Sequence, residues 1–129
     1  MVTRNQIYDY VESNVNTAAR SVYCASVLEP IPKFFPACYI TEISHYPSRT
    51  NIELDHDDEQ LIRDFEVHSF SALQNNALIE AMDIMEDVET AMREIGFIET
   101  YCGQANNADP TVVHVVARFT RVFGGSDTI

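Results

Sequence analysis

The sequence predicts a single α+β domain in which two main helices pack on a mostly antiparallel, or mixed, sheet of four to five strands. Two patterns carry this prediction. Apolar residues recur at helical spacing over residues 77–95, and they alternate with polar residues in the segments before and after that stretch. The expected order is α-β-β-(β)-β-α-β-β, and 129 residues is the length of one domain. Residues 1–129 are therefore expected to form one unit.

The first helix is expected over residues 4–19. Thr3 can cap it, and Gln6, three residues later, completes a capping box. Its buried face is predicted from apolar residues at helical spacing, namely Ile7, Val11, Val15 and Ala18. The apolar run at residues 22–28 is then expected to form a strand.

An extended connector should follow, because Pro30, Pro32 and Pro36 exclude a helix and deny a sheet its backbone donors. Phe34 and Phe35 lie in this connector. They are expected either to fold back as a lid on the core or to meet another chain, and the lid is favoured.

Two further strands are expected at residues 37–44 and 60–70, because both stretches alternate in polarity. Between them we expect a turn or loop and then a projecting arm at residues 51–60. The arm consists of a short strand or extended piece and an acidic tip, which together comprise Asn51, Ile52, Glu53, Leu54, Asp55, His56, Asp57, Asp58 and Glu59.

The acidic tip resembles a calcium-binding loop in spacing. Counting from Asp55 as position 1, acidic residues fall at positions 3, 5 and 12, but Gln60 stands at position 6, where the sharp turn needs glycine. The tip is therefore interpreted as a solvated hairpin end whose like charges block pairing with other strand edges.

The second helix is the most clearly patterned element. Ser71 and Gln74 form a capping box that predicts its start, and Gly96 supplies the left-handed residue that ends it. A broad apolar stripe runs along one side, and the other side is acidic. The acids of interest on that side are Glu80, Asp83, Asp87 and Glu94.

The last two strands are expected at residues 97–102 and 111–123, joined by a polar turn at 103–110. The final strand is apolar on both faces, with His114 and Arg118 between its apolar residues. Such a strand is either central and covered twice, or covered by a neighbouring subunit. Residues 124–129 are expected to form a flexible polar tail.

Composition excludes several classes of function. The formal net charge is −12, which disfavours binding to nucleic acid or to an anionic membrane surface. No segment has the roughly 20 apolar residues that a membrane span requires. The three cysteines fit neither a disulfide framework nor a zinc site, so we expect small buried residues in a reducing, cytosolic setting.

The sequence contains no pattern typical of catalysis. It has no nucleophile motif and no glycine-rich phosphate loop, and its four histidines lack metal-ligand spacing. His68 and His114 lie on predicted strands that could bring them together across the sheet. We therefore expect no enzyme activity, no cofactor and no metal.

Several short segments, in this order along the chain, give it a family resemblance. The segments are Pro36–Ser44, Phe65–Ser71, Ala81–Val88, Met92–Phe97 and Ala108–Phe119. Together they resemble the tail terminator, or tail-completion, proteins of long-tailed bacteriophages, which join head and tail. The resemblance implies a virion protein, assembled in the host cytoplasm, that forms a ring, usually a hexamer. It implies three partners: copies of itself, the tail tube protein and the head connector.

The resemblance also implies positions for contact. The arm and tip at residues 51–59 would reach a neighbour or the tube, and Phe34 and Phe35 would lie at a subunit seam. The helix acids would face either the channel, through which DNA passes without specific binding, or water, and water is favoured. Two alternatives remain: another neck or tail module, such as a head-closure or tube protein, and a small α+β ligand-binding domain or enzyme.

Overall fold

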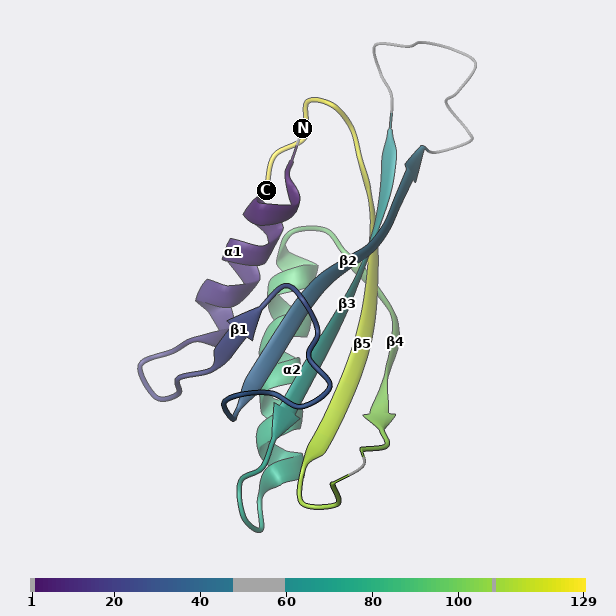
Figure 1. Ribbon diagram of the computed structural model, residues 1–129. Helices are drawn as coiled ribbons and strands as arrows, with labels where there is room; N and C mark the ends of the chain where they lie inside the picture. Colours follow the sequence, from purple (N-terminus) through teal and green to yellow (C-terminus); the bar gives the residue numbers. More distant parts are fainter. Residues whose placement is uncertain (1, 48–59, 108) are drawn as a thin grey trace.

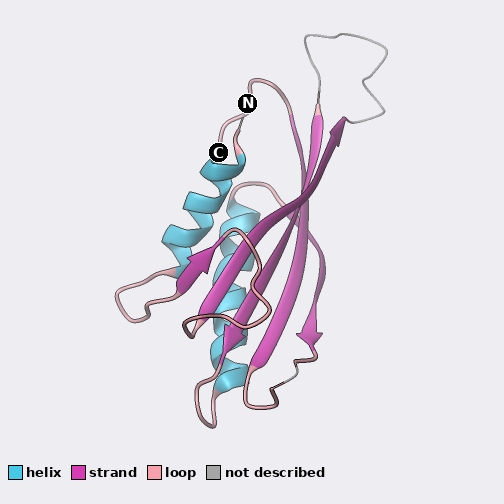
Figure 2. Cartoon of the chain, viewed as in Figure 1, coloured by secondary structure: helices cyan, strands magenta, loops and turns pink. Residues whose placement is uncertain are grey.

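The protein forms two helices packed on one face of a five-stranded sheet (Figures 1 and 2). The computed structural model describes residues 2–47, 60–107 and 109–129. The elements in chain order are α1 (Arg4–Val15), β1 (Tyr23–Ala25), β2 (Ala37–Pro47), β3 (Leu61–Ser71), α2 (Ala77–Glu94), β4 (Ile98–Ala105) and β5 (Val113–Phe123). The predicted α+β class is confirmed.

The strands lie in the order β1-β2-β3-β5-β4. β1 pairs with β2 in parallel, and the other three pairings are antiparallel, so the sheet is mixed. The long strands β2, β3 and β5 run side by side as the middle of the sheet, whereas β4 forms one edge (Figure 1).

The core lies between the helices and one face of the sheet. From α1 it takes three of the four predicted positions, Ile7, Val11 and Val15, whereas Ala18 lies beyond the helix and is exposed. α2 buries most of the apolar stripe predicted from its periodicity, but Leu78 and Met82 of that stripe are exposed. The sheet supplies alternate residues of its central strands. The sheet side of this core includes Cys38, Ile40, Phe65, Val67, Val115, Ala117, Phe119 and Phe123.

α1 is shorter than predicted, because the chain turns directly after it. The helix ends at Val15, and the side-chain oxygen of Asn16 accepts the backbone N–H of Val22 at 2.7 Å. Thr17 and Arg20 exchange two backbone hydrogen bonds. The predicted extension to residue 19 was therefore wrong. β1 was also overestimated, because only three of its predicted seven residues pair with β2.

The predicted capping box of α2 was wrong, although the helix itself is present. Ser71 is the last residue of β3, and its hydroxyl donates to Glu80 at 2.7 Å. The helix begins at Ala77 with no side-chain cap, after Asn75 has taken a positive φ of 71°. At the other end Gly96 has φ 87°, which confirms the predicted left-handed terminator.

β4 extends three residues into the predicted polar turn. Gly103, Gln104 and Ala105 continue the ladder opposite Val116, Val115 and His114. Pairing along the edge of β5 outweighs the weak strand preference of this polar stretch. Among the described residues, neither helix has the length and apolar content required to cross a bilayer.

Candidate functional site

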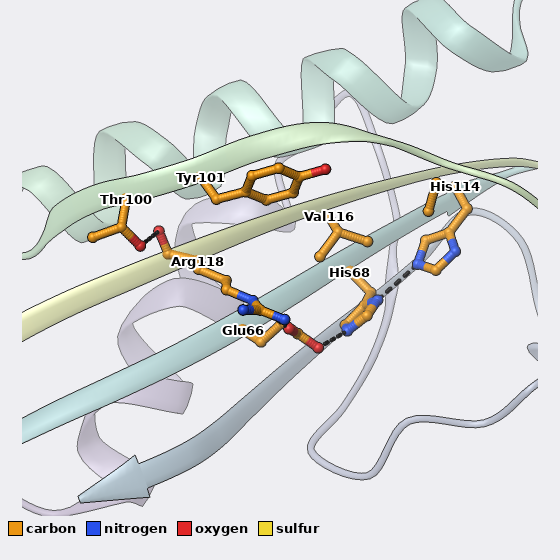
Figure 3. Close-up of a pocket in the computed structure, with 8 residues that line it drawn as sticks. Glu66, His68, Thr100, Tyr101, His114, Val116 and Arg118 are labelled. Carbon is orange, nitrogen blue, oxygen red and sulfur yellow. Dashed lines mark hydrogen bonds and ion pairs between the residues drawn. The ribbon is translucent and has the colours of Figure 1, made fainter.

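The candidate site is the face of the sheet opposite the helices, called here the open face. Because successive strand residues point to opposite sides, Glu66 and His68 on β3 lie on the side away from the core residues Phe65 and Val67. His114, Val116 and Arg118 on β5 lie on the same side (Figure 3). The helices do not cover this side (Figure 1).

One end of the open face is closed by a small aromatic cluster. The buried rings of Tyr39 and Phe70 pack edge-on with their centroids 5.7 Å apart, and the ring centroid of Tyr23 lies 6.2 Å from that of Tyr39. The ring centroid of Phe34, in the connector, lies 5.4 Å from that of Tyr23, but Phe34 is 62% exposed and Phe35 is also exposed. The connector therefore folds toward the sheet, as the lid requires, without burying either phenylalanine. Their role at a subunit seam stays a prediction.

Beyond this cluster a hydrogen-bonded row crosses the open face. Strand register places Glu66 opposite Arg118 and His68 opposite Val116. His114 is two residues from Val116 along β5, so it lies diagonally across from His68 on the same face. Glu66 contacts Nε2 of His68 at 2.6 Å through one oxygen and accepts Nε of Arg118 at 2.8 Å through the other. Nδ1 of His68 lies 2.7 Å from Nε2 of His114 (Figure 3). The predicted approach of the two histidines is confirmed.

The row restricts the tautomers of the two rings. A carboxylate on Glu66 accepts a hydrogen bond from Nε2–H of His68, so when His68 carries only this proton, its Nδ1 accepts from Nε2–H of His114. Two protons on each ring would set Nδ1–H of His68 against Nε2–H of His114. Burial and the nearby His68 lower the pKa of His114 to about 4. Burial opposes ionisation of Glu66, but hydrogen bonds from His68 and Arg118 outweigh it and lower the pKa of Glu66.

Beside this row lies a shallow depression of about 570 Å³. Both Glu66 oxygens are already bonded, whereas the η nitrogens of Arg118 and the hydroxyl of Tyr101 have no hydrogen-bond partner within the described ranges. The Tyr101 ring lies over Gly103, where its oxygen would stand 2.7 Å from an added Cβ. The two η nitrogens of Arg118 form a positively charged pair of donors, and this geometry suits the binding of a carboxylate.

The sequence interpretation missed this arrangement. It placed His114 and Arg118 among the apolar residues of the last strand but did not connect them with Glu66, and both lie on the open face with Val116. The signal was present in the numbering, because residues 114, 116 and 118 have the same parity. What the sequence did not reveal is that the helices cover only the opposite parity.

Three of the four predicted helix acids are held by neighbours. Ser71 donates to Glu80, Arg20 forms an ion pair with Asp87, and the Tyr10 hydroxyl donates to Glu94 at 2.5 Å. Asp83 is exposed, and no hydrogen bond to it is found in the described parts of the chain. The assignment of these acids to a channel stays a prediction.

The predicted arm residues lie outside the described residues. These are Asn51, Ile52, Glu53, Leu54, Asp55, His56, Asp57, Asp58 and Glu59. Their contact with a neighbour or a tube therefore stays a prediction from the sequence.

One side-chain group among the described residues has the composition of a metal site. Ligand atoms of Glu89, Glu99 and Cys102 all lie within 4.8 Å of one another. Burial and the nearby acids raise the pKa of Cys102, and burial followed by Glu99 raises that of Glu89, so both groups hold protons more firmly than usual. The expectation of three buried cysteines was wrong, because Cys102 is exposed and Cys24 is half-buried. Cys24 pairs in strand register with the buried Cys38.

Comparison with known proteins was made on sequence and on fold. No family model matches the chain, and no curated protein matches it. One similar solved structure is described as the virion of a native gene transfer agent particle; it has 14% identity and a TM-score of 0.58, with 92% of each chain covered. The chain shares the fold of this virion protein.

A second solved structure is described as the sheath/tube terminator of PVC, an extracellular contractile injection system, in its extended state. Identity is 7% and the TM-score is 0.49, with 96% of this chain and 57% of that chain covered.

Proposed function

We propose that this chain is a structural protein of a phage-like tail. In this proposal, copies of the chain form a ring that terminates the tail tube and joins it to the head connector, and DNA passes through the lumen without specific binding. The observation that carries the proposal is the fold shared with a gene transfer agent virion protein over 92% of both chains.

Three further features support this role. The family resemblance in sequence points to tail terminators independently of the fold comparison. The 18-residue helix α2 also distinguishes the chain from tube and head-closure modules, which are rich in barrels or sandwiches and lack a long central helix. The acidic surplus of the whole chain suits a channel for DNA, because carboxylates repel phosphate.

Deletion of the gene and electron microscopy of the resulting particles test the proposal. Without the ring, heads and tail tubes should accumulate separately, and a plasmid copy should restore joined particles. Mass spectrometry of purified particles should then find the chain at about six copies per tail, as the hexameric ring implied by the family resemblance requires. Normal particles made without the gene would contradict the proposal.

The predicted arm gives a second test of the same role. Deleting residues 52–58 should leave the thermal unfolding midpoint nearly unchanged and stop tail joining. Deleting residues 125–129 from the polar tail is the matched control and should leave joining intact. Unchanged joining after the arm deletion would remove the arm from the proposed contact.

One observation favours the alternative of a small ligand-binding domain or enzyme. The open face has a depression with a histidine whose pKa is lowered to about 4. Against this, the depression is shallow and both oxygens of Glu66 are engaged. Turnover of a small molecule, or tight binding that shifts the ring NMR signals of His68 and His114, would support the alternative.

A further inference from the structure

We infer that the open face of the sheet is a docking surface for a second copy of this chain, and that Arg118 on this face binds carboxylates on the exposed side of that copy's α2. The inference rests on the proposed ring and adds which two surfaces build it. The two surfaces differ, so each copy would use one toward its left neighbour and the other toward its right.

The first surface, called the helix patch, is the exposed apolar side of α2. Leu78, Ile79 and Met82 are exposed, with Ile79 at 61%, and their spacing places them on one side of the helix. A depression of about 550 Å³ lies beside Ile79 and reaches Leu73, which is also exposed. Exposed apolar side chains gathered on one side of a helix suit a contact with another protein surface.

The second surface, called the sheet patch, lies on the open face near the β4 edge. Ile98 is 68% exposed and Tyr101 is 52% exposed, and Val122 on β5 is exposed as well. Tyr101 pairs with Arg118, and both line the donor-lined depression. Ile98 pairs with Thr120, which is two residues from Arg118 along β5 and on the same face of the sheet. The patch therefore combines apolar area with unused hydrogen-bond donors.

Charge decides which surface meets which. The Arg118 side chain is 57% exposed, and only its Nε is bonded to Glu66. On α2, Asp83 and Glu86 are exposed and continue the side that carries Met82. A guanidinium fork can bind a carboxylate with two parallel hydrogen bonds.

Contact between identical surfaces lacks this complementarity. Two helix patches in contact would set acids against acids, and two sheet patches would set Arg118 against Arg118. Sheet patch against helix patch pairs opposite charges and buries apolar area on both sides.

The positions of the two patches fit a ring. The helices lie behind the sheet, so the sheet patch and the helix patch are on opposite sides of the molecule (Figure 1). A contact between different surfaces repeats from copy to copy and closes into a ring when the rotation allows. A standard contact of about 800 Å² per partner would use roughly a tenth of the 7749 Å² surface.

Blocked variants test the two surfaces separately. Ile98→Glu blocks the sheet patch and Ile79→Glu blocks the helix patch, while Ile129→Glu is the matched control at the exposed C-terminus. Circular dichroism and thermal unfolding establish that each variant is folded. Analytical ultracentrifugation in about 0.3 M salt, where screening is strong, should show rings for the wild type and the control, and monomers for each blocked variant.

Mixing the blocked variants gives the decisive result. An equal mixture of Ile98→Glu and Ile79→Glu has one intact sheet patch and one intact helix patch per pair. It should form 1:1 dimers that grow no further, which a contact between two identical surfaces cannot produce. Monomers in the mixture, or rings from either blocked variant alone, would overturn the inference.

The role of Arg118 is tested by a double-mutant cycle. The variant Arg118→Gln and the double variant Asp83→Asn/Glu86→Gln, which neutralises the two α2 acids, should each weaken association by about tenfold. Combined, they should still cost about tenfold, because both remove the same contact. Additive losses would remove Arg118 from the contact.

The inference and the proposed function can fail separately. A wild-type chain that stays monomeric at about 1 mM, where even millimolar affinity populates a complex, would overturn the docking surfaces. Particle assembly after gene deletion would still decide the proposed function on its own.

Discussion

At the scale of single residues, His114 should make stability depend on pH. Its pKa is lowered from 6.5 to about 4 by burial and by His68, so the unfolded chain binds its proton at a higher pH than the folded chain does. The stabilisation is complete above pH 6.5 and is lost as the pH falls from about 6.5 to about 4. Because the ring is only half buried, we expect a loss of about 1–2 kcal/mol over that range.

Chemical denaturation at several pH values measures this effect. His114→Gln should flatten the dependence of unfolding free energy on pH between 6.5 and 4, while the amide can still donate to His68. His45→Gln is the control, because His45 is exposed and lies outside the row. An unchanged slope in the His114 variant would mean that the ring titrates normally.

Ser69 should contribute more than its small size indicates. Its hydroxyl is fully buried and donates to the carbonyl of Ala81 at 2.9 Å, which ties β3 to α2. Ser69→Ala should lower the unfolding free energy by about 1 kcal/mol, because the buried carbonyl loses this partner. In Ser13→Ala, loss of a comparable but exposed bond to Tyr10 should change it far less. Equal effects in the two variants would contradict the buried tie.

At the scale of elements, the end of α2 depends on Gly96. Its φ of 87° is unfavourable for any residue with a Cβ, and an added Cβ would lie 3.2 Å from the Arg121 side chain. Gly96→Ala should therefore lower the unfolding free energy by about 1–2 kcal/mol. Gly125→Ala is the matched control, because nothing lies within 4 Å of its Cβ position. Thermal unfolding of both variants measures the difference, and no difference would contradict the requirement for a left-handed residue at position 96.

The same elements show what the sequence could predict. The end of α2 at Gly96 and the alternation of β3 follow from local sequence patterns and were predicted correctly. The apolar stripe of α2 was predicted correctly for its buried residues, but Leu78 and Met82 are exposed. Element starts were harder, because one residue can serve two local motifs. The local sequence predicts that Ser71 caps a helix, but in the fold Ser71 ends β3 and its hydroxyl donates a hydrogen bond to Glu80. Tertiary pairing decided the outcome there and at β4.

At the scale of the whole molecule, the candidate site could be predicted only in part. The meeting of His68 and His114 follows from two strands that pair, and it was anticipated. The bonding of Glu66 with Arg118 depends on β3 and β5 being direct neighbours, and a sequence does not state strand order. The open face itself depends on both helices packing on the same side, which periodicity within each helix leaves undetermined.

Net charge predicts how the proposed association should respond to salt. Each copy carries a formal charge of −12, so two copies repel at long range. Screening shortens the Debye length from about 30 Å at 0.01 M salt to about 10 Å at 0.1 M, whereas a desolvated pair between Arg118 and a carboxylate is screened much less. Association should therefore strengthen as salt rises over this range, which sedimentation measures directly. Asp9→Lys, an exposed change on α1 outside both patches, lowers the repulsion and should shift ring formation to lower salt. Association that weakens steadily with added salt would mean that attraction between opposite charges, and not apolar contact, holds the copies together.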